Sequence, residues 1–411
     1  MKLTANGRRW VGFPLSLFVI LTACQGGPTS TRDNTSATSA RDFSADRLAV
    51  LTQVVQADID AKRIPGAVIL IASNGRVVFE KALGRQEPQT GTLMSPNAIF
   101  RIRSMTKPIV SVGAMMLVED GKLLLSDLVS QHLPELKDLK VEDHTIGSDG
   151  KKTSKLVPAK QEMTVHDLLR HTSGLSGNIS GEITSNDDLL KKLAKLSLVF
   201  HPGTAWDYGA SIDVLGALIE RISGKALDDY LRARILKPLK MEDSGFWVEP
   251  AKYGRMAEPF EIDPDTNVPT RFPSLRTRPT FLDASGGMVS TARDYLRFAQ
   301  LLLNGGQLDG VRILSPKTVE LMTSDHVNGL PGVNPFVPSG YGFGLGFAVR
   351  KSIGGCAFPG SLGDYTWVGV GGTIFWVDPH ERMIAIFMMQ APGQLNRYIR
   401  LSRDMVYSAS L

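Results

Sequence analysis

The spacing of apolar positions predicts a helix and then a β-hairpin at the start of the folded chain. Leucine, valine and isoleucine recur at helical spacing across residues 48–59, after Ser44, a residue type that caps helices. Two β-type runs follow at residues 67–72 and 77–82, with Asn74-Gly75 between them. Both residues of this dipeptide tolerate the positive φ of a type I′ turn, so we expect the two runs to pair as a hairpin.

The middle of the chain changes to helical periodicity, and the last third returns to strands. Helical patterns cover residues 104–119, 164–171, 185–196, 211–222 and 226–238. The last third predicts four strands and a closing helix, at residues 344–349, 365–370, 373–377, 383–389 and 395–407. Residues 138–162 are rich in lysine, aspartate and glycine without periodicity, so we expect a surface excursion there.

Strands at both ends of the chain, with helices between them, predict an α/β (α+β) fold. Consecutive hairpin-like strands favour one antiparallel sheet, built from the N- and C-terminal parts and flanked by helices, over a doubly wound parallel sheet. We expect the α/β part to span about 42–103 and 281–411, and an inserted, mainly helical part to span about 104–280. A cleft between the two parts is the expected place for a functional site.

The N-terminus has the features of an export signal. Lys2, Arg8 and Arg9 precede a mostly apolar stretch of 14 residues, 10–23, which is too short to span a bilayer comfortably. Residues 1–23 are therefore predicted to be a signal peptide. The residues that follow, up to 41, are rich in serine, threonine and glycine and have no apolar period, as expected of a flexible tether.

The end of this signal, Leu21-Thr22-Ala23-Cys24, resembles the lipobox of bacterial lipoproteins. The resemblance implies that Cys24 is lipidated on its thiol and becomes the first residue of the mature, membrane-anchored protein. The alternative is a plain signal peptide in which Cys24 is incidental. Gln25, rather than aspartate, follows the cysteine, which implies an outer-membrane lipoprotein of the bacterial cell envelope that faces the periplasm.

Composition narrows the classes of partner. The 411 residues are 43% hydrophobic, which is enough for a full core, and carry a formal net charge of +5. This charge falls to +2 without the three basic residues of the leader, and no basic block occurs elsewhere, so nucleic acid is not implied. Cys356 is the only cysteine besides Cys24, so the exported chain has no disulfide framework.

Candidate chemistry begins with a serine and a lysine at S-x-x-K spacing. The common serine-hydrolase pattern G-x-S-x-G is absent, and S-x-x-K occurs twice. Ser148 and Lys151 lie in the polar excursion beside a glycine, and we interpret that match as chance. Ser104 and Lys107 instead begin an apolar helical run, and Pro108 fits only in a first helical turn.

A position at the start of a helix has chemical consequences for Ser104 and Lys107. Residues i and i+3 share a helix face, so the Lys107 amine can reach the Ser104 hydroxyl. Free N–H groups and the helix dipole favour developing negative charge there. The same field, together with burial, disfavours a protonated Lys107 and so favours its action as a base. The segment alone leaves open the alternative of a capping serine with a solvated lysine.

Six ordered motifs add a family resemblance. They lie at residues 100–107, 121–127, 168–175, 202–208, 286–292 and 342–347. With them the chain, from about residue 42 to its C-terminus, resembles the serine β-lactamase and penicillin-binding-protein family in its class C-like branch. It is most similar to the family VIII carboxylesterases of that branch. The resemblance implies the β-lactamase/DD-peptidase-like fold.

The resemblance also implies roles for individual residues. Ser104 would be the nucleophile, with Lys107 and Tyr208 as general base and acid. The second motif of the family is Tyr-x-Asn, and Tyr208-Gly209-Ala210 keeps the tyrosine but lacks the asparagine. Positive neighbours such as Lys107 would favour the phenolate of Tyr208. An aromatic packing residue is the alternative for this tyrosine.

The third family motif, Lys-Thr-Gly, is replaced. Trp367-Val368-Gly369 stands in its place and is similar to the Trp-Gly-Gly variant of the family VIII carboxylesterases. Gly369 would let the strand approach closely. The resemblance implies that the backbone N–H groups of Val370 and Ser104 form an oxyanion hole.

The two replacements bear on the substrate. An indole and a methyl group stand where β-lactam-processing relatives have a lysine and an asparagine, so we expect a neutral, more apolar small-molecule ester. The main hypothesis is therefore a carboxylesterase. The alternatives are a class C-like β-lactamase (or weak activity of that kind), a D-alanyl-D-alanine peptidase, and a catalytically idle envelope binding protein. No cofactor or metal is implied, because His166 and His201 lack metal-ligand spacing and His171 fits a structural loop residue.

Overall fold

The computed structural model describes residues 43–146, 152–332 and 337–411. The predicted signal peptide, Cys24 and the tether lie outside the described residues, and so does the pair Ser148 and Lys151. In the described part of the chain, no helix is long and apolar enough to cross a membrane. The predicted limits of the domain parts, near residues 103 and 281, stay predictions.

The first helix and hairpin are as predicted. Helix α1 (Ala45–Asp60) is capped by Ser44, whose hydroxyl accepts the Arg47 N–H at 3.3 Å. Strands β1 (Gly66–Ser73) and β2 (Arg76–Glu87) pair antiparallel across the two-residue turn. Asn74 and Gly75 have φ values of 50° and 77°, so both adopt the positive φ that a type I′ turn requires.

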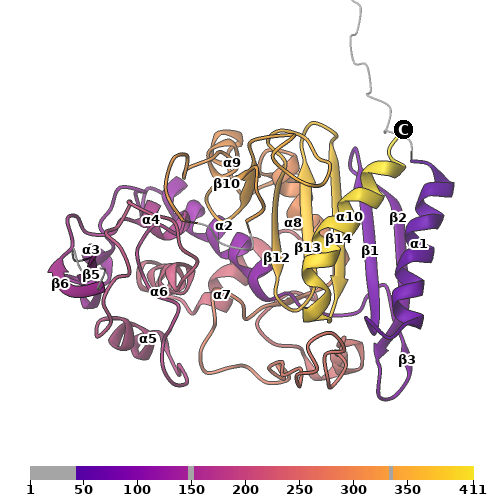
Figure 1. Cartoon of the computed structure of the whole chain (residues 1–411), viewed down its shortest axis with the longest axis horizontal. Coiled ribbons are helices and arrows are strands. Elements are labelled where there is room, and N and C mark those ends of the chain that lie inside the picture. Colours follow the sequence, from indigo (N-terminus) through magenta and orange to yellow (C-terminus); the bar gives the residue numbers. More distant parts are fainter. Residues whose placement is uncertain (1–42, 147–151, 333–336) are drawn as a thin grey trace, which may run out of the picture. The chain divides into compact units, whose positions relative to one another are not determined.

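One antiparallel sheet joins the two ends of the chain, as predicted (Figure 1). Its strand order is β10-β11-β12-β13-β14-β1-β2-β3, and all neighbours are antiparallel. The other strands are β3 (Thr92–Leu93), β10 (Tyr341–Phe343), β11 (Ala348–Arg350), β12 (Tyr365–Gly369), β13 (Thr373–Asp378) and β14 (Met383–Met389). Strand β14 pairs with β1 along its whole length, so the last strand closes the sheet against the first.

The predicted single strand at residues 344–349 is wrong. The chain turns there, and β10 and β11 form a tight hairpin in which Gly344 N donates to Phe347 O at 2.7 Å. Gly346 has a φ of 95°, which interrupts an extended run. The sequence of residues 344–349 did not reveal the turn, because its glycines favour a turn while its aromatic and other apolar residues favour a strand.

Helices cover both faces of the sheet (Figure 1). Side chains on one face of β1, such as Ile69, pack with α1 and with the closing helix α10 (Leu395–Ala409). Side chains on the other face, such as Leu70, belong to a larger core with α2 (Thr106–Glu119) and α8 (Ala292–Leu303). Both faces of β1 are buried, so the strand is apolar throughout rather than alternating.

The region between β3 and β10 is mainly helical. Its elements are η1 (Arg103–Met105), α2, α3 (Val129–His132), η2 (Pro134–Leu136), α4 (Val165–Leu169), α5 (Asn186–Leu193), α6 (Ser211–Ser223), α7 (Leu227–Leu231), the π-helical turn η3 (Arg232–Leu236), η4 (Pro250–Arg255), α8 and α9 (Pro316–Met322). Helices α8 and α9 were not predicted. The 3-10 turn η5 (Pro392–Gln394) precedes α10.

Three short strand pairs complete the fold. They are β4 (Phe100–Arg101) with β7 (Val289–Ser290), β5 (Lys140–Ile146) with β6 (Lys152–Pro158), and β8 (Gln307–Leu308) with β9 (Val311–Arg312). The β5–β6 pair lies in the stretch without periodicity, where no strands were expected. It is a local hairpin held by backbone pairing, and such pairing leaves little hydrophobic pattern in the sequence.

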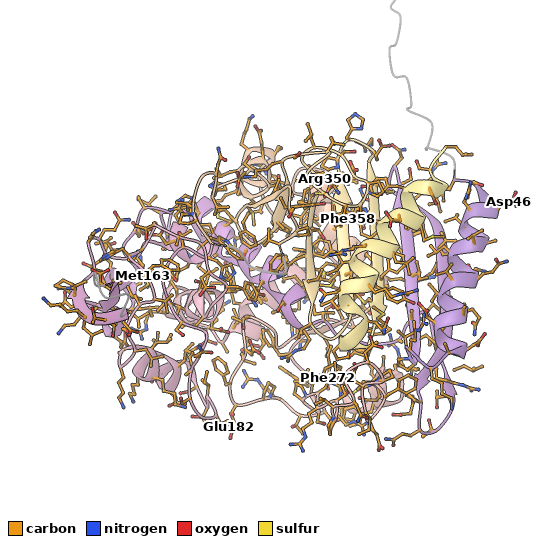
Figure 2. All side chains as sticks on the ribbon, viewed as in Figure 1. Asp46, Met163, Glu182, Phe272, Arg350 and Phe358 are labelled. Carbon is orange, nitrogen blue, oxygen red and sulfur yellow. The ribbon has the colours of Figure 1, made fainter. Side chains whose placement is uncertain are left out.

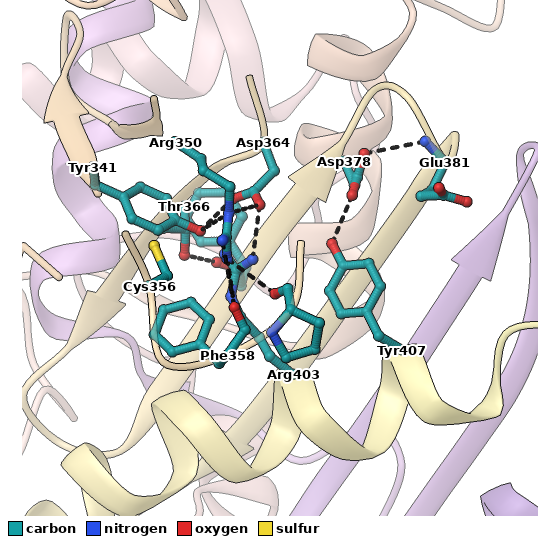
Figure 3. Close-up of polar contacts among 12 residues, drawn as sticks. Tyr341, Arg350, Cys356, Phe358, Asp364, Thr366, Asp378, Glu381, Arg403 and Tyr407 are labelled. Atoms are coloured by element: carbon teal, nitrogen blue, oxygen red, sulfur yellow. Dashed lines mark hydrogen bonds and ion pairs between the residues drawn. The ribbon is translucent and has the colours of Figure 1, made fainter. Parts of the chain in front are cut away.

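A buried ion-pair network ties the last strands to α10 (Figure 3). Asp364 Oδ2 accepts Arg350 Nε at 2.7 Å and Arg403 Nη1 at 3.1 Å, and Oδ1 accepts the Tyr341 hydroxyl at 2.5 Å. The three charged side chains are at most 2% exposed. The guanidinium of Arg350 also lies 5.2 Å from the Phe358 ring centre, beside α10 (Figure 2). Asp364 is therefore the carboxylate that two buried cations share.

Replacing Asp364 with alanine is expected to lower the free energy of unfolding by about 3–5 kcal/mol, because two buried guanidinium groups lose their partner. Denaturant unfolding followed by circular dichroism measures the change. The control is Glu320→Gln, in an ion pair with Lys317 whose side chains are 66% and 85% exposed. That change should cost less than about 1 kcal/mol. Equal effects of the two substitutions would contradict the expectation.

Candidate active site

The predicted nucleophile lies in a tight turn between β4 and α2. Ser104 is the middle residue of η1, which leads directly into α2, so the expected place at a helix start is confirmed. Met105 anchors this turn, because its side chain is fully buried and its carbonyl accepts the Tyr295 hydroxyl at 2.9 Å. Arg103, just before the serine, has a φ of 48°. The turn thus holds Ser104 half-buried at the wall of a cavity.

Lys107 lies on the same face of the helix start as Ser104. Its Nζ donates to Ser104 Oγ at 3.4 Å and to the Ser285 carbonyl at 2.7 Å. The side chain is only 3% exposed, so the alternative of a solvated lysine is wrong. The amine also lies 4.5 Å from the centre of the Tyr208 ring. The structure therefore brings Tyr208, which is far away in the sequence, to Ser104 and Lys107.

Tyr208 is held against aromatic neighbours. Its ring lies 4.8 Å from the ring of His171 and 5.5 Å from that of Trp367. His171 is fully buried, and burial together with the charge of Lys107 holds its pKa well below the usual range. The neutral imidazole packs in an aromatic cluster, which is consistent with the structural role predicted for it.

The third-motif strand, β12, approaches the nucleophile turn very closely. A Cβ on Gly369 would meet the Ile102 carbonyl oxygen at 2.2 Å and Thr373 Oγ1 at 2.3 Å. Thr373 Oγ1 itself donates to the same carbonyl at 3.1 Å. The glycine therefore allows β12 to lie against the turn that carries Ser104, as the sequence predicted. Val370 follows directly and is 46% exposed.

Trp367 has a different environment. Its side chain is 2% exposed and packs against Tyr208 and Phe343, with ring centres 5.5 and 5.2 Å apart. It is not among the residues that line the cavity at Ser104. The structure places the indole beside the tyrosine, and its predicted contact with substrate stays a prediction.

The cavity at Ser104 has a volume of about 380 Å³. Besides Ser104, Lys107 and Tyr208, it is lined by Arg103, Gly177, Ile179, Ile183, Gly209, Ala210, Asp213, Phe281, Asp283, Ser285 and Gly286. Ala210 stands at the wall where the family motif has its asparagine. The cavity combines apolar side chains with one cation besides the lysine, Arg103, and with two carboxyl groups.

Those two carboxyl groups were not predicted from the sequence. Asp213 lies in the first turn of α6, and Asp283 lies in the loop after Phe281. Burial, and after it the charge of Asp283, raises the pKa of Asp213 to about 7. The available signal was an aspartate inside the otherwise apolar run 212–219 of this helix, where a charged residue is costly unless it has partners.

The described part of the chain holds no group of three or more His, Cys, Asp or Glu side chains that could bind a metal ion.

Comparison with known proteins agrees with this geometry. The family described as Beta-lactamase matches residues 51–404, which is most of the chain. The chain belongs to the beta-lactamase family. Its fold class and its resemblance to this family are thus confirmed.

Relatives within the beta-lactamase family include proteins with different descriptions. Protein Rv1367c of Mycobacterium tuberculosis is 35% identical over 356 residues, which cover 80% of this chain and 87% of that protein. Esterase EstB of Burkholderia gladioli is 30% identical over 369 residues, which cover 82% and 88%. Among solved structures, EstCE1, "a hydrolase with promiscuous acyltransferase activity", has a TM-score of 0.73 at 26% identity and covers 88% of this chain and 99% of its own. This beta-lactamase-family chain therefore has serine-hydrolase relatives that include esterases.

Replacing Gly369 with alanine is expected to lower the free energy of unfolding by about 1–3 kcal/mol, because the methyl group must push the Ile102 carbonyl away. Thermal and denaturant unfolding measure the change. Gly254→Ala is the matched control, since a Cβ there meets nothing within 4 Å. It should leave stability unchanged or slightly higher. A Gly369 variant as stable as the control would show that the strand and the turn need not lie so close.

Proposed function

We propose that this chain is a serine hydrolase that cleaves carboxylic esters through an acyl-enzyme on Ser104. The observation that carries the proposal is the convergence of Ser104 Oγ, Lys107 Nζ and the Tyr208 ring on one cavity of about 380 Å³. A nucleophile with a base within reach is the arrangement that acyl transfer needs. The likeness to EstB and EstCE1 supports an ester as the substrate.

The proposed reaction has two halves, acylation and deacylation of Ser104, and the base carries one proton in each. Lys107 or Tyr208 takes the Ser104 proton while Oγ attacks the ester carbonyl and the carbonyl electrons move onto its oxygen. Collapse of this intermediate breaks the bond to the alcohol oxygen, which receives the proton as it leaves. Water then attacks the acyl-enzyme, gives up a proton in the same way, and releases the acid and the free Ser104 hydroxyl.

The oxyanion is assigned to two backbone donors, the N–H groups of Ser104 and Val370. Ser104 lies at the start of a helix, where N–H groups and the helix dipole favour negative charge. Val370 follows Gly369, whose close approach to Ile102 brings this end of β12 to the nucleophile turn. Trp367 packs against the ring of Tyr208 and would hold that ring in place.

The lining of the cavity supports a neutral acyl group of modest size. Ile179, Ile183 and Phe281 are apolar, and Ala210 offers no amide at the position of the motif asparagine. Such a wall binds a substrate with an apolar acyl chain better than a substrate with a polar side chain. An ester also has a better leaving group than an amide and needs less help in the transition state.

Arg103 favours a second candidate, β-lactam or D-alanyl peptide hydrolysis. It lines the cavity immediately before Ser104, and its Nη1 donates to the Gly286 carbonyl at 3.4 Å. A guanidinium there would supply the positive charge for a substrate carboxylate that the motif lysine supplies in β-lactam-processing relatives. This candidate and the esterase differ in substrate and share the acyl-enzyme.

Replacing Ser104 with alanine is expected to lower kcat/KM for short p-nitrophenyl esters by at least about 10³-fold, because the nucleophile is lost. The purified protein is assayed against the ester series and against nitrocefin. Ser111→Ala, in the helix α2 that follows the nucleophile turn and fully buried, is the control and should keep wild-type activity.

Each other outcome has a defined meaning. A kcat/KM for nitrocefin above that of every ester would favour a β-lactamase. Labelling of Ser104 by a fluorophosphonate, detected as the mass of the intact protein, tests the nucleophile without a substrate. Absence of labelling in the folded protein would favour a catalytically idle binding protein.

We also propose that the protein is a lipoprotein anchored to the outer membrane and facing the periplasm. Cys24→Ser, expressed in a bacterial host, is expected to lose incorporation of radiolabelled palmitate and to move from the membrane to the soluble fraction, since the lipid is the anchor. Cys356→Ser is the control and should remain labelled. Palmitate incorporation that persists without Cys24 would refute the assignment.

A further inference from the structure

The backbone of Ser285 connects Lys107 to the two carboxyl groups of the cavity. The Ser285 carbonyl accepts Lys107 Nζ at 2.7 Å. The N–H of the same residue donates to Asp213 Oδ1 at 3.1 Å and to Asp283 Oδ1 at 2.9 Å. Its hydroxyl also donates to Asp283 Oδ1, at 2.9 Å. The carbonyl that holds the lysine therefore belongs to a residue whose other polar groups are held by Asp213 and Asp283.

The contacts of Lys107 suit a base. Among the described residues, no carboxylate oxygen lies within ion-pair distance of its Nζ, and its hydrogen-bond partners are the neutral oxygens of Ser104 and Ser285. A carboxylate in direct contact would stabilise the ammonium form, which has no free electron pair to accept the Ser104 proton. Asp213 and Asp283 are instead separated from the amine by Ser285.

The two carboxyl groups cannot both be charged without cost. Both accept the same N–H, so their oxygens lie close together, and like charges at such a distance favour a shared proton. Asp213 projects from α6, while Asp283 comes from the loop that also carries Ser285. The charged and titratable groups facing Asp213 are Asp283, Lys107 and, across the cavity, Arg103 and Tyr208.

We propose that Asp213 is a positioning residue for Lys107, which it orients through the backbone of Ser285 while it shares one proton with Asp283. This inference rests on the proposed function of Ser104 and Lys107. The carboxyl pair takes no part in the proton transfers, which run between Ser104, Lys107, Tyr208 and the leaving group. Its shared proton keeps the pair at a single negative charge, which limits the negative potential at Lys107 Nζ.

The pair has a defined pH dependence. As pH rises through about 7, Asp213 loses the shared proton and the pair gains a second negative charge. A second negative charge near Lys107 Nζ attracts an ammonium ion, which has no free electron pair to accept the Ser104 proton. A variant that cannot ionise at position 213 should therefore react faster at Ser104, relative to the wild type, as the pH rises.

The test is the rate at which a fluorophosphonate labels Ser104, measured on the full chain in detergent at a series of pH values from about 5.5 to about 9. Asp213→Asn keeps an acceptor for the Ser285 N–H and should label within about threefold of the wild-type rate at the low end. Its rate relative to wild type should rise by at least about threefold through neutral pH. Asp213→Ala lacks the acceptor and should label at least about fivefold more slowly throughout.

Asp294→Asn is the matched control. Asp294 is also buried, and burial raises its pKa to about 6, but it binds Ser244 and the Asp243 N–H and does not line the cavity. This variant should keep the wild-type pH profile. An unchanged pH profile in Asp213→Asn, together with wild-type labelling of Asp213→Ala, would overturn the proposal.

A second readout does not depend on Ser104. The raised pKa means that native Asp213 holds a proton that its unfolded form loses near pH 4, so this group should lower wild-type stability as pH rises from about 4 through 7. The Tm of Asp213→Asn relative to wild type should therefore increase over that range, and a constant difference would refute the shared proton. If the wild-type protein is not labelled but the Tm difference still changes with pH, the proposed function is wrong, while the shared proton of Asp213 and Asp283 is supported.

Discussion

The close contact between β12 and the nucleophile turn is the constraint on which the site depends. The Gly369 backbone lies so near the Ile102 carbonyl that even a methyl group would overlap it, and Thr373 hydrogen-bonds the same oxygen. The contact fixes the turn just before Ser104 and places Val370 next to it. The central sheet, closed by the pairing of β14 with β1, holds β12 in register for this contact.

The electrostatic design of the cavity follows from that placement. A helix start directs N–H groups at the serine, while a buried lysine reaches it from the next turn. Aromatic rings, including the neutral ring of His171, pack against Tyr208. The negative charge of the site is carried by Asp213 and Asp283, and Ser285 separates these carboxyl groups from Lys107. They can therefore orient the amine without forming an ion pair with it. Ser285 thus lies between the base and the two carboxyl groups.

Local signals in the sequence predicted the elements that depend on neighbours along the chain. The hairpin at Asn74-Gly75 was predicted because two residues with positive φ between apolar runs permit few alternatives. The extended run at 344–349 was misjudged, since only the packing of Gly346 against α2 shows why the chain turns there. The β5–β6 hairpin was missed because backbone pairing on a polar surface needs no apolar pattern. Helix α8 was missed although it packs in the core under β14.

The sequence by itself determined that Ser104 and Lys107 share one face of a helix start, because residues three apart lie on the same side of a helix. The burial of Lys107 then decided against a solvated lysine. The sequence also placed the strands at both ends of one antiparallel sheet, and the ordered motifs indicated the family. Only the tertiary structure decided which distant groups face this pair. Tyr208, Ser285 and Asp213 come from loops and a helix that no local pattern connects to Lys107. Their meeting depends on packing between elements about a hundred or more residues apart, and periodicity along a chain carries no information about such distances.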